Sequence, residues 1–446
     1  MTKDLTTGSE GRVLLRFALP VIGGNLFQLF YTLADTMIVG RTIGADALAA
    51  VGATSSIVYF ILCFIQGLTS GFGIRLGQLF GAKNETGMRR SVAASTLLSI
   101  LFTVLLTAVS CALAHPILSL LNTPADIYDM AFSYLFVIFL GTGATVFYNL
   151  ISNLLRALGD SRTPLIFLIF SALLNIVLDV LFIVPLRMGV AGAAWATVLS
   201  QLLSAVLCTI FALKRFPVLH VGRDAWKAAP SLMGDHLKIG FPMGFQMSVM
   251  CIGQLAMQAA VNGIGTAAIA GYTAATKVDQ LSVLVDNAFG VAISNFVAQN
   301  FGAGLYPRIR KGVNACLLQL ELCNLAMGGL LLACQRFVVP LFVDHPTAEI
   351  MGYAQSYLTV VIPFYLLLGL LMVYRTSLQS IGVGWAPFAA CIIELIMRIL
   401  CATGLSRRFG YPGICFATPL AWIGAVALLI PVYFIVMHRR CPKSAQ

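Results

Sequence analysis

The sequence predicts an all-α integral membrane protein with twelve transmembrane helices in two six-helix bundles around a central cavity. Composition is the first observation behind this prediction. Charged residues make up only 10% of the 446 residues and 59% are hydrophobic, whereas a soluble domain has about 25% charged residues. The second observation is a repeat of half the chain length, which is typical of transporters built from two bundles.

The repeat is visible in short matching segments. Gly77–Ala82 (GQLFGA) returns as Ala298–Ala303 (AQNFGA), and each copy ends an apolar run and precedes basic residues. Other pairs occur in the same order: Ala18–Pro20 with Gly240–Pro242, Ala157–Gly159 with Ser380–Gly382, Pro164 with Pro387, and Gly192–Thr197 with Gly413–Thr418. Solenoid repeats are only about 20 to 50 residues long, so this repeat indicates a duplicated half-protein. Six spans per half give both halves one orientation, which is a parallel pseudo-two-fold repeat.

The spans follow from the apolar runs, because a membrane helix needs about 20 such residues. They are expected near 14–38, 47–76, 91–114, 129–153, 164–186, 190–213, 239–261, 278–300, 313–334, 350–374, 386–406 and 413–437. Residues 214–238 form the longest polar stretch. We therefore expect an N-terminal lobe over 1–213, a cytoplasmic linker over 214–238 and a C-terminal lobe over 239–446.

The net charge of +11 reflects orientation in a membrane rather than nucleic-acid binding. About twenty of the 28 Lys and Arg fall on one side of the expected spans, and cytoplasmic loops carry such an excess. The opposite side holds Arg41, Arg187, Arg336, Arg407 and Arg408. Both termini and the linker are therefore expected in the cytoplasm, in a multi-pass protein of a bacterial cytoplasmic membrane whose partner is the lipid bilayer.

Motifs for other functions are missing from the sequence. No Gly-x-x-x-x-Gly-Lys-Ser/Thr phosphate loop occurs, so we expect no ATP binding. The eleven Cys are scattered without a Cys-x-x-Cys pair, and the five His have no metal-binding spacing. No nucleophile and base stand together, so we expect neither an enzyme nor a cofactor.

Asp35 is the most costly residue in the first span. A carboxylate there costs about 2.5 to 3.5 kcal/mol on insertion scales, so the side chain is expected to face a protein cavity. Gln28 and Tyr31 precede it by seven and four residues. This spacing places all three on one helix face, which we expect to form one wall of a polar cavity.

The fifth span carries a second polar face. Asn175 and Asp179 are four residues apart, and Thr197 in the next span could join them. Two acids, an amide and a hydroxyl could bind Na⁺ through hard oxygen ligands, or one acid could carry a proton because two close carboxylates disfavour double ionisation. Either interpretation predicts a cation-coupling site. Asn149 and Asn153 repeat the spacing in the fourth span and are further cavity candidates.

The second half lacks these acids. Alignment on the prolines places Ala256 or Met257 opposite Asp35. Its own acidic residues are Asp279, Asp286, Glu321 and Glu394. Asp286 is the best candidate for a substrate contact, whereas Glu394 and Arg398, four residues apart, are expected to neutralise each other.

Pro20 and Pro242 lie inside the first span of each half. A proline removes one helical hydrogen bond and bends the helix, either as a static kink or as a hinge. Because Pro20 shares its helix with Asp35, we expect a hinge there. The rest of the expected cavity surface is apolar and aromatic, which would suit lipophilic organic cations. The residues concerned are Phe27, Phe30, Tyr59, Phe64, Phe147, Met247, Met250 and Met257.

Over nearly its whole length the sequence resembles the multidrug and toxic compound extrusion (MATE) family. The residues that carry the resemblance are Pro20, Asp35–Gly40, Gly77-Gln78 with Gly81-Ala82, Leu155–Asp160, Asn175 with Asp179, and Gly192–Thr197. The resemblance implies two six-helix lobes, alternating access and antiport of cationic compounds against H⁺ or Na⁺. Within the family, the N-terminal half of the sequence resembles the DNA-damage-inducible type of bacterial and archaeal members. This resemblance implies that Asp35, Asn175, Asp179 and Thr197 bind the coupling cation. Another branch of the family has an acidic residue in its seventh helix. This sequence has Met250 in that neighbourhood, so the acidic residue has no match here.

Taken together, these features predict an H⁺- or Na⁺-coupled exporter of small cationic molecules, acting as a monomer with coupling in the N-terminal half. If Na⁺ is the coupling ion, Asp35, Asn175, Asp179 and Thr197 are its expected ligands. The alternative is a lipid-linked oligosaccharide flippase of the same superfamily, for which Arg75 and Arg398 are the hints.

Overall fold

The computed structural model describes residues 4–343 and 347–440, and over these ranges the chain is helical without any strand. The first half holds α1 (Glu10–Thr42), α2 (Ala45–Gly81), α3 (Glu85–Leu120), α4 (Ala125–Leu140), α5 (Thr142–Ala157), α6 (Arg162–Ile183) and α7 (Gly189–Arg215). The rest holds η1 (Pro217–Leu219), α8 (Arg223–Asn262), α9 (Thr266–Gly302), α10 (Tyr306–Val338), η2 (Val339–Phe342), α11 (Ala348–Val361), η3 (Ile362–Phe364), α12 (Tyr365–Ser380), α13 (Trp385–Phe409), α14 (Tyr411–Cys415) and α15 (Ala417–Arg440).

The prediction of twelve spans is confirmed by the lengths and apolar composition of these helices. Within the described residues eleven helical segments are long and apolar enough to cross a membrane, and the bent pair α4–α5 makes a twelfth. Only helices and closed barrels satisfy their backbone polar groups in hydrocarbon, which is why uninterrupted apolar runs fold this way.

The fourth expected span, 129–153, is two helices that meet at 44° rather than one. Gly141 lies between them, and a Cβ atom on Gly141 would collide with the Val198 side chain of α7. The bend therefore lies where α7 packs against a backbone without a side chain.

The chain packs as two compact units. One contains Gly23–Met247, and the other contains Leu5–Ile22 together with the chain from Ser248 onward. The division falls inside α1 shortly after Pro20, and inside α8 shortly after Pro242. Packing therefore groups residues differently from the repeat, which divides the chain at 214–238.

In the first unit, α2 packs against α3, α4 and α5, while α7 packs against α5 and α6. A buried apolar core joins α2, α3, α5 and α7, with Phe72, Leu98, Leu155 and Cys208 fully buried. The second half of α1 lies on α6, where a Cβ atom on Gly24 would touch Leu165 and Leu168 at 3.6 Å. This contact helps to position the part of α1 that carries Asp35.

Closely approaching glycines join α2 to the first half of α8. A Cβ atom on Gly67 would collide with the backbone of Met243, and one on Gly71 would lie 2.6 Å from the backbone nitrogen of Gly240. Small residues four apart allow helices to approach this closely in membranes.

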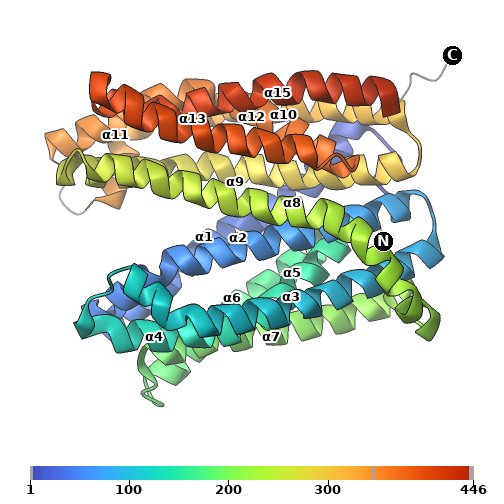
Figure 1. Cartoon of the computed structure of the whole chain (residues 1–446), viewed down its shortest axis with the longest axis horizontal. Helices are drawn as coiled ribbons and strands as arrows, with labels where there is room; N and C mark the ends of the chain where they lie inside the picture. The colour runs from blue at the N-terminus through green and yellow to red at the C-terminus, as the bar shows by residue number, and fades with distance from the viewer. Residues whose placement is uncertain (1–3, 344–346, 441–446) are drawn as a thin grey trace. The chain divides into compact units, whose positions relative to one another are not determined.

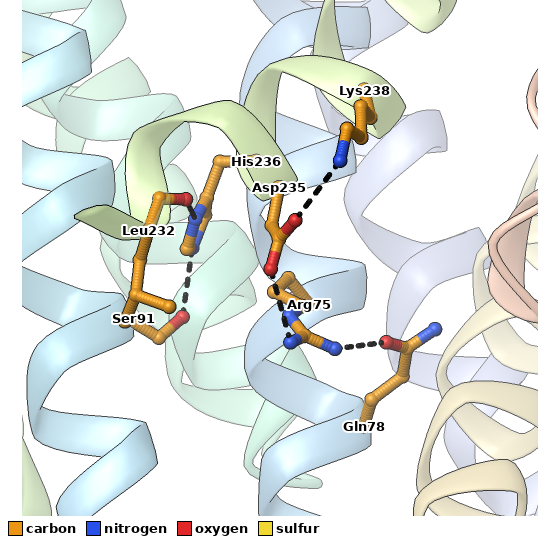
Figure 2. A network of polar contacts seen from close by, with 7 residues as sticks. All are labelled: Arg75, Gln78, Ser91, Leu232, Asp235, His236 and Lys238. Carbon is orange, nitrogen blue, oxygen red and sulfur yellow. Dashed lines mark hydrogen bonds and ion pairs between the residues drawn. The ribbon is translucent and has the colours of Figure 1, made fainter. Parts of the chain in front are cut away.

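Polar contacts fasten the same segment of α8, as Figure 2 shows. Asp235 accepts a hydrogen bond from Arg75 of α2 at 3.4 Å. His236 is fully buried and lies 2.8 Å from the Ser91 hydroxyl of α3 through Nε2, while its Nδ1 donates to the Leu232 carbonyl. The start of α8 is thereby held on both α2 and α3.

In the second unit α9 packs against α10, α11 and α12, and α13 packs against α15 (Figure 1). The repeated motif on α9 holds the segment before α1. Gln299 accepts a hydrogen bond from the Leu5 backbone N–H at 2.9 Å, Asn300 donates to the Leu5 carbonyl at 3.2 Å, and Arg308 donates to the Thr7 carbonyl at 3.0 Å. The start of α1 is thus tied to the second unit, as the start of α8 is tied to the first.

The crossing of α2 and α8 can be tested by adding a single methyl group. Gly71→Ala is expected to destabilise the protein by about 1 to 3 kcal/mol, because the added atom meets backbone that cannot rotate away. The measurement is the thermal unfolding temperature of the purified protein. Gly52→Ala is the control, since Gly52 is also in α2 and has no atom within 4 Å of an added Cβ. An equal response of both variants would contradict the assigned contact.

Candidate cation site

Helices α1 and α6 bring two acidic residues together in the first unit. Asp179 is fully buried in α6, and Asp35 is half-buried in α1. Their carboxyl groups lie within hydrogen-bonding reach of each other. Two ionised carboxylates repel at such a separation, so the contact requires a proton or a cation.

Asn175 links this acid pair to α7. It is fully buried one helical turn before Asp179. With its amide oriented by its partners, the nitrogen donates to Asp179 Oδ2 at 2.9 Å, and the oxygen accepts from the Thr197 backbone N–H at 3.0 Å. Three of the four residues predicted for cation coupling thus form one hydrogen-bonded chain, and the fourth, Asp35, contacts it through Asp179.

Two tyrosines complete the group. The Tyr31 hydroxyl lies near Thr197 and near both Asp35 and Asp179. Tyr134 of α4 also lies near both acids, although the sequence analysis did not single it out. A hydroxyl inside the apolar run of α4 was the available signal, but an aromatic residue there is also compatible with simple packing.

The acid pair retains unused hydrogen-bonding capacity. Oδ1 of Asp35 and Oδ1 of Asp179 are both buried without a hydrogen-bond partner. No Lys or Arg forms an ion pair with either acid in the part of the chain that the structure describes. Buried polar atoms almost always find partners, and these two oxygens have none among the described residues.

Among the described residues, the other cavity candidates of the first half make no hydrogen bond to this group. Gln28 is exposed on α1. Asn149 donates to the Thr145 carbonyl of its own helix at 2.9 Å. Asn153 is buried and donates to the Thr69 hydroxyl of α2 at 3.1 Å, which joins α5 to α2.

A second acidic cluster lies in the other unit. Asp286 is fully buried in α9 and accepts a hydrogen bond from Asn324 of α10 at 3.1 Å. Its Oδ2 and both carboxyl oxygens of Glu321 are buried without partners. Asp279 accepts a hydrogen bond from the Tyr365 hydroxyl at 2.5 Å. Asp286 therefore sits in a polar interior, with one oxygen still available.

Glu394 of α13 binds two arginines. The expected ion pair with Arg398 is present at 3.8 Å, and a shorter contact joins Glu394 to Arg375 of α12. Sequence reasoning missed Arg375, although an arginine inside the apolar run of α12 was a visible signal. Glu394 is committed to this interaction and is 3% exposed.

Comparison with known proteins places the chain in a family. The family model described as MatE matches twice, at residues 20–181 and 242–403, which confirms the duplication. The probable multidrug resistance protein YpnP of Bacillus subtilis is 31% identical over 402 residues, covering 88% of this chain and 87% of the relative.

Solved structures share the fold. A structure described as MATE in the straight conformation has a TM-score of 0.89 at 21% identity, covering 99% of this chain and all of its own. One described as MATE in the bent conformation has a TM-score of 0.88 at 22% identity, covering 98% of this chain and 97% of its own. The chain therefore belongs to the MatE family of multidrug and toxic compound extrusion transporters, as the resemblance in its motifs predicted.

Proposed function

We propose that this transporter exports lipophilic organic cations by antiport against H⁺ or Na⁺. The contact between the carboxyl groups of Asp35 and Asp179 is the observation that carries the proposal. Intramembrane acids are costly and mark ion pathways. A pair that faces each other without a basic partner holds together only while a cation or proton neutralises it.

Binding and release of that ion would change how α1 packs. When the pair is neutral, Asp35 can stay against Asp179 on α6. When the ion leaves, repulsion between the two carboxylates favours moving α1 away from α6. A ligand that binds one of two conformations more tightly shifts the population toward that conformation. The bound ion would therefore favour one of the two conformations of the alternating-access cycle, and its release would favour the other.

Pro20 is the proposed hinge for this change. The packing of α1 passes from one unit to the other just after Ile22, two residues beyond the proline. The missing backbone hydrogen bond at a proline lowers the cost of bending. Relatives described as straight and bent conformations of MATE are consistent with such a hinge.

The substrate is proposed to be cationic. The name of the relative YpnP includes multidrug resistance, and the free oxygen of Asp286 offers a substrate contact in the second unit. The flippase alternative is less favoured, because Arg75 binds Asp235 and Arg398 binds Glu394. Neither arginine presents an uncompensated charge to an anionic headgroup. We further propose a monomer with both termini in the cytoplasm, in a bacterial cytoplasmic membrane.

Replacing one acid tests the coupling site. Asp35→Asn is expected to reduce drug resistance and vesicle transport to background, because the pair can no longer bind and release a positive charge. Membrane insertion, measured by protein yield and elution from a sizing column, should be unchanged. Asp126→Asn, an exposed acid at the start of α4, is the control. Unchanged drug resistance in the Asp35→Asn variant would refute the mechanism.

The coupling ion can be determined in reconstituted vesicles loaded with a fluorescent organic cation. Imposing a pH gradient and a Na⁺ gradient separately should drive transport by the wild-type protein in at least one case. Asp179→Asn should respond to neither gradient, because it removes the second acid of the pair. If neither gradient changed the transport rate of the wild type, the energy source would be neither H⁺ nor Na⁺.

The hinge predicts a kinetic defect without a binding defect. Pro20→Ala restores a helical hydrogen-bond donor and is expected to slow transport while leaving equilibrium binding of the organic cation near the wild-type value. Pro116→Ala is a matched control, since Pro116 is also inside a long helix, α3. Equal transport rates in both variants and the wild type would indicate that Pro20 is only a static kink.

A further inference from the structure

The first unit contains a cavity of about 580 Å³ away from the acid pair. Its walls come from α3, α5 and α7, and the segment Leu219–Trp226 forms one end. None of Asp35, Asn175, Asp179 and Thr197 lines it. The cavity is therefore a separate feature that cation coupling does not explain.

The cavity is apolar inside and basic at one end. Leu150, Ile151 and Leu154 of α5 contribute buried aliphatic walls. Arg89 and His220 line the exposed end. No acidic residue lines the cavity, so its charge complements an anion attached to an apolar chain.

The basic side chains at this end are available to a ligand. Arg89 takes part in none of the ion pairs among the described residues. The Nδ1 atom of His220 lies 3.2 Å from the Pro217 carbonyl, which fixes the ring and leaves Nε2 on the other side. Trp226 also lines this end and is 38% exposed, and tryptophan favours the boundary between hydrocarbon and headgroups.

The end of the cavity is held in place by the contacts of α8. His236 bonds to Ser91, two residues after Arg89 on α3, and Asp235 bonds to Arg75 on α2 (Figure 2). The segment that carries His220 and Trp226 leads directly into this fastened part of α8. The end of the cavity that Arg89 and His220 line is thus fixed by side-chain contacts between α8 and the neighbouring helices.

We propose that this cavity binds an anionic phospholipid from the cytoplasmic leaflet, with an acyl chain between α3, α5 and α7 and the phosphate at Arg89 and His220. The sidedness rests on the orientation proposed above. Basic pockets between membrane helices bind anionic headgroups on the cytoplasmic side. A transported cation would be repelled by Arg89, so the occupant is a lipid rather than the exported substrate.

The test measures lipid binding to the full-length protein in detergent by native mass spectrometry. The probes are dioleoyl phosphatidylglycerol and dioleoyl phosphatidylcholine, which share acyl chains and differ in charge. Wild type is expected to retain the phosphatidylglycerol preferentially. Arg89→Ala should weaken that binding about fivefold, whereas Arg90→Ala, the adjacent exposed arginine that does not line the cavity, should leave it unchanged.

A filling variant tests the acyl chain independently of charge. Thr209→Trp places a large ring in the cavity and should reduce retention of phosphatidylglycerol, while Leu207→Trp, on the same helix and outside the lining, should not. Equal retention of the two lipids, or equal effects of Arg89→Ala and Arg90→Ala, would overturn the proposal. Displacement of the lipid by glycerol phosphate would indicate a site for a free anion instead, and displacement by tetraphenylphosphonium would indicate a substrate vestibule.

Discussion

The contact between the Asp35 and Asp179 carboxyl groups is the constraint on which the first unit depends. Each acid is expensive in a membrane, and neither has a basic partner among the described residues. The surrounding polar groups are arranged to limit that cost. Asn175 donates to Asp179, Thr197 donates to the amide oxygen of Asn175, and the hydroxyl of Tyr31 lies near Thr197. These contacts link the acid pair to α1, α6 and α7.

The first helix of each half, α1 or α8, packs partly in one unit and partly in the other. The start of α1 is held by Gln299, Asn300 and Arg308 in the second unit, and its later part carries Asp35 in the first. The start of α8 is held by Arg75 and Ser91 in the first unit. The two copies of the repeated motif, Gly77-Gln78 and Ala298-Gln299, thus lie in corresponding places. Each is at or beside the residues that bind the start of the first helix of the other half.

The sequence predicted the spans because apolar runs of sufficient length can only be helices in a membrane. It also grouped Asp35, Asn175, Asp179 and Thr197, since acids inside such runs need partners and the one-turn spacing shows which face they share. The same spacing in Asn149 and Asn153 predicts a shared helix face but not the partners on it, since Asn149 donates to the Thr145 carbonyl of its own helix and Asn153 donates to Thr69 of α2. Arg375 and Glu394 meet from different helices, and Val198 of α7 packs against Gly141, where α4 and α5 meet. Such contacts depend on tertiary structure that local pattern does not encode.

The continuity of α8 has a mechanical consequence. It runs unbroken for 40 residues, a length of about 60 Å, and therefore about twice the hydrocarbon thickness of a bilayer. Pro230 and Pro242 lie inside this helix, and each removes one backbone hydrogen bond, so the helix is weakest at these two positions. The backbone that continues from the first half into the second is therefore helical throughout Arg223–Asn262, with two prolines at which it can bend.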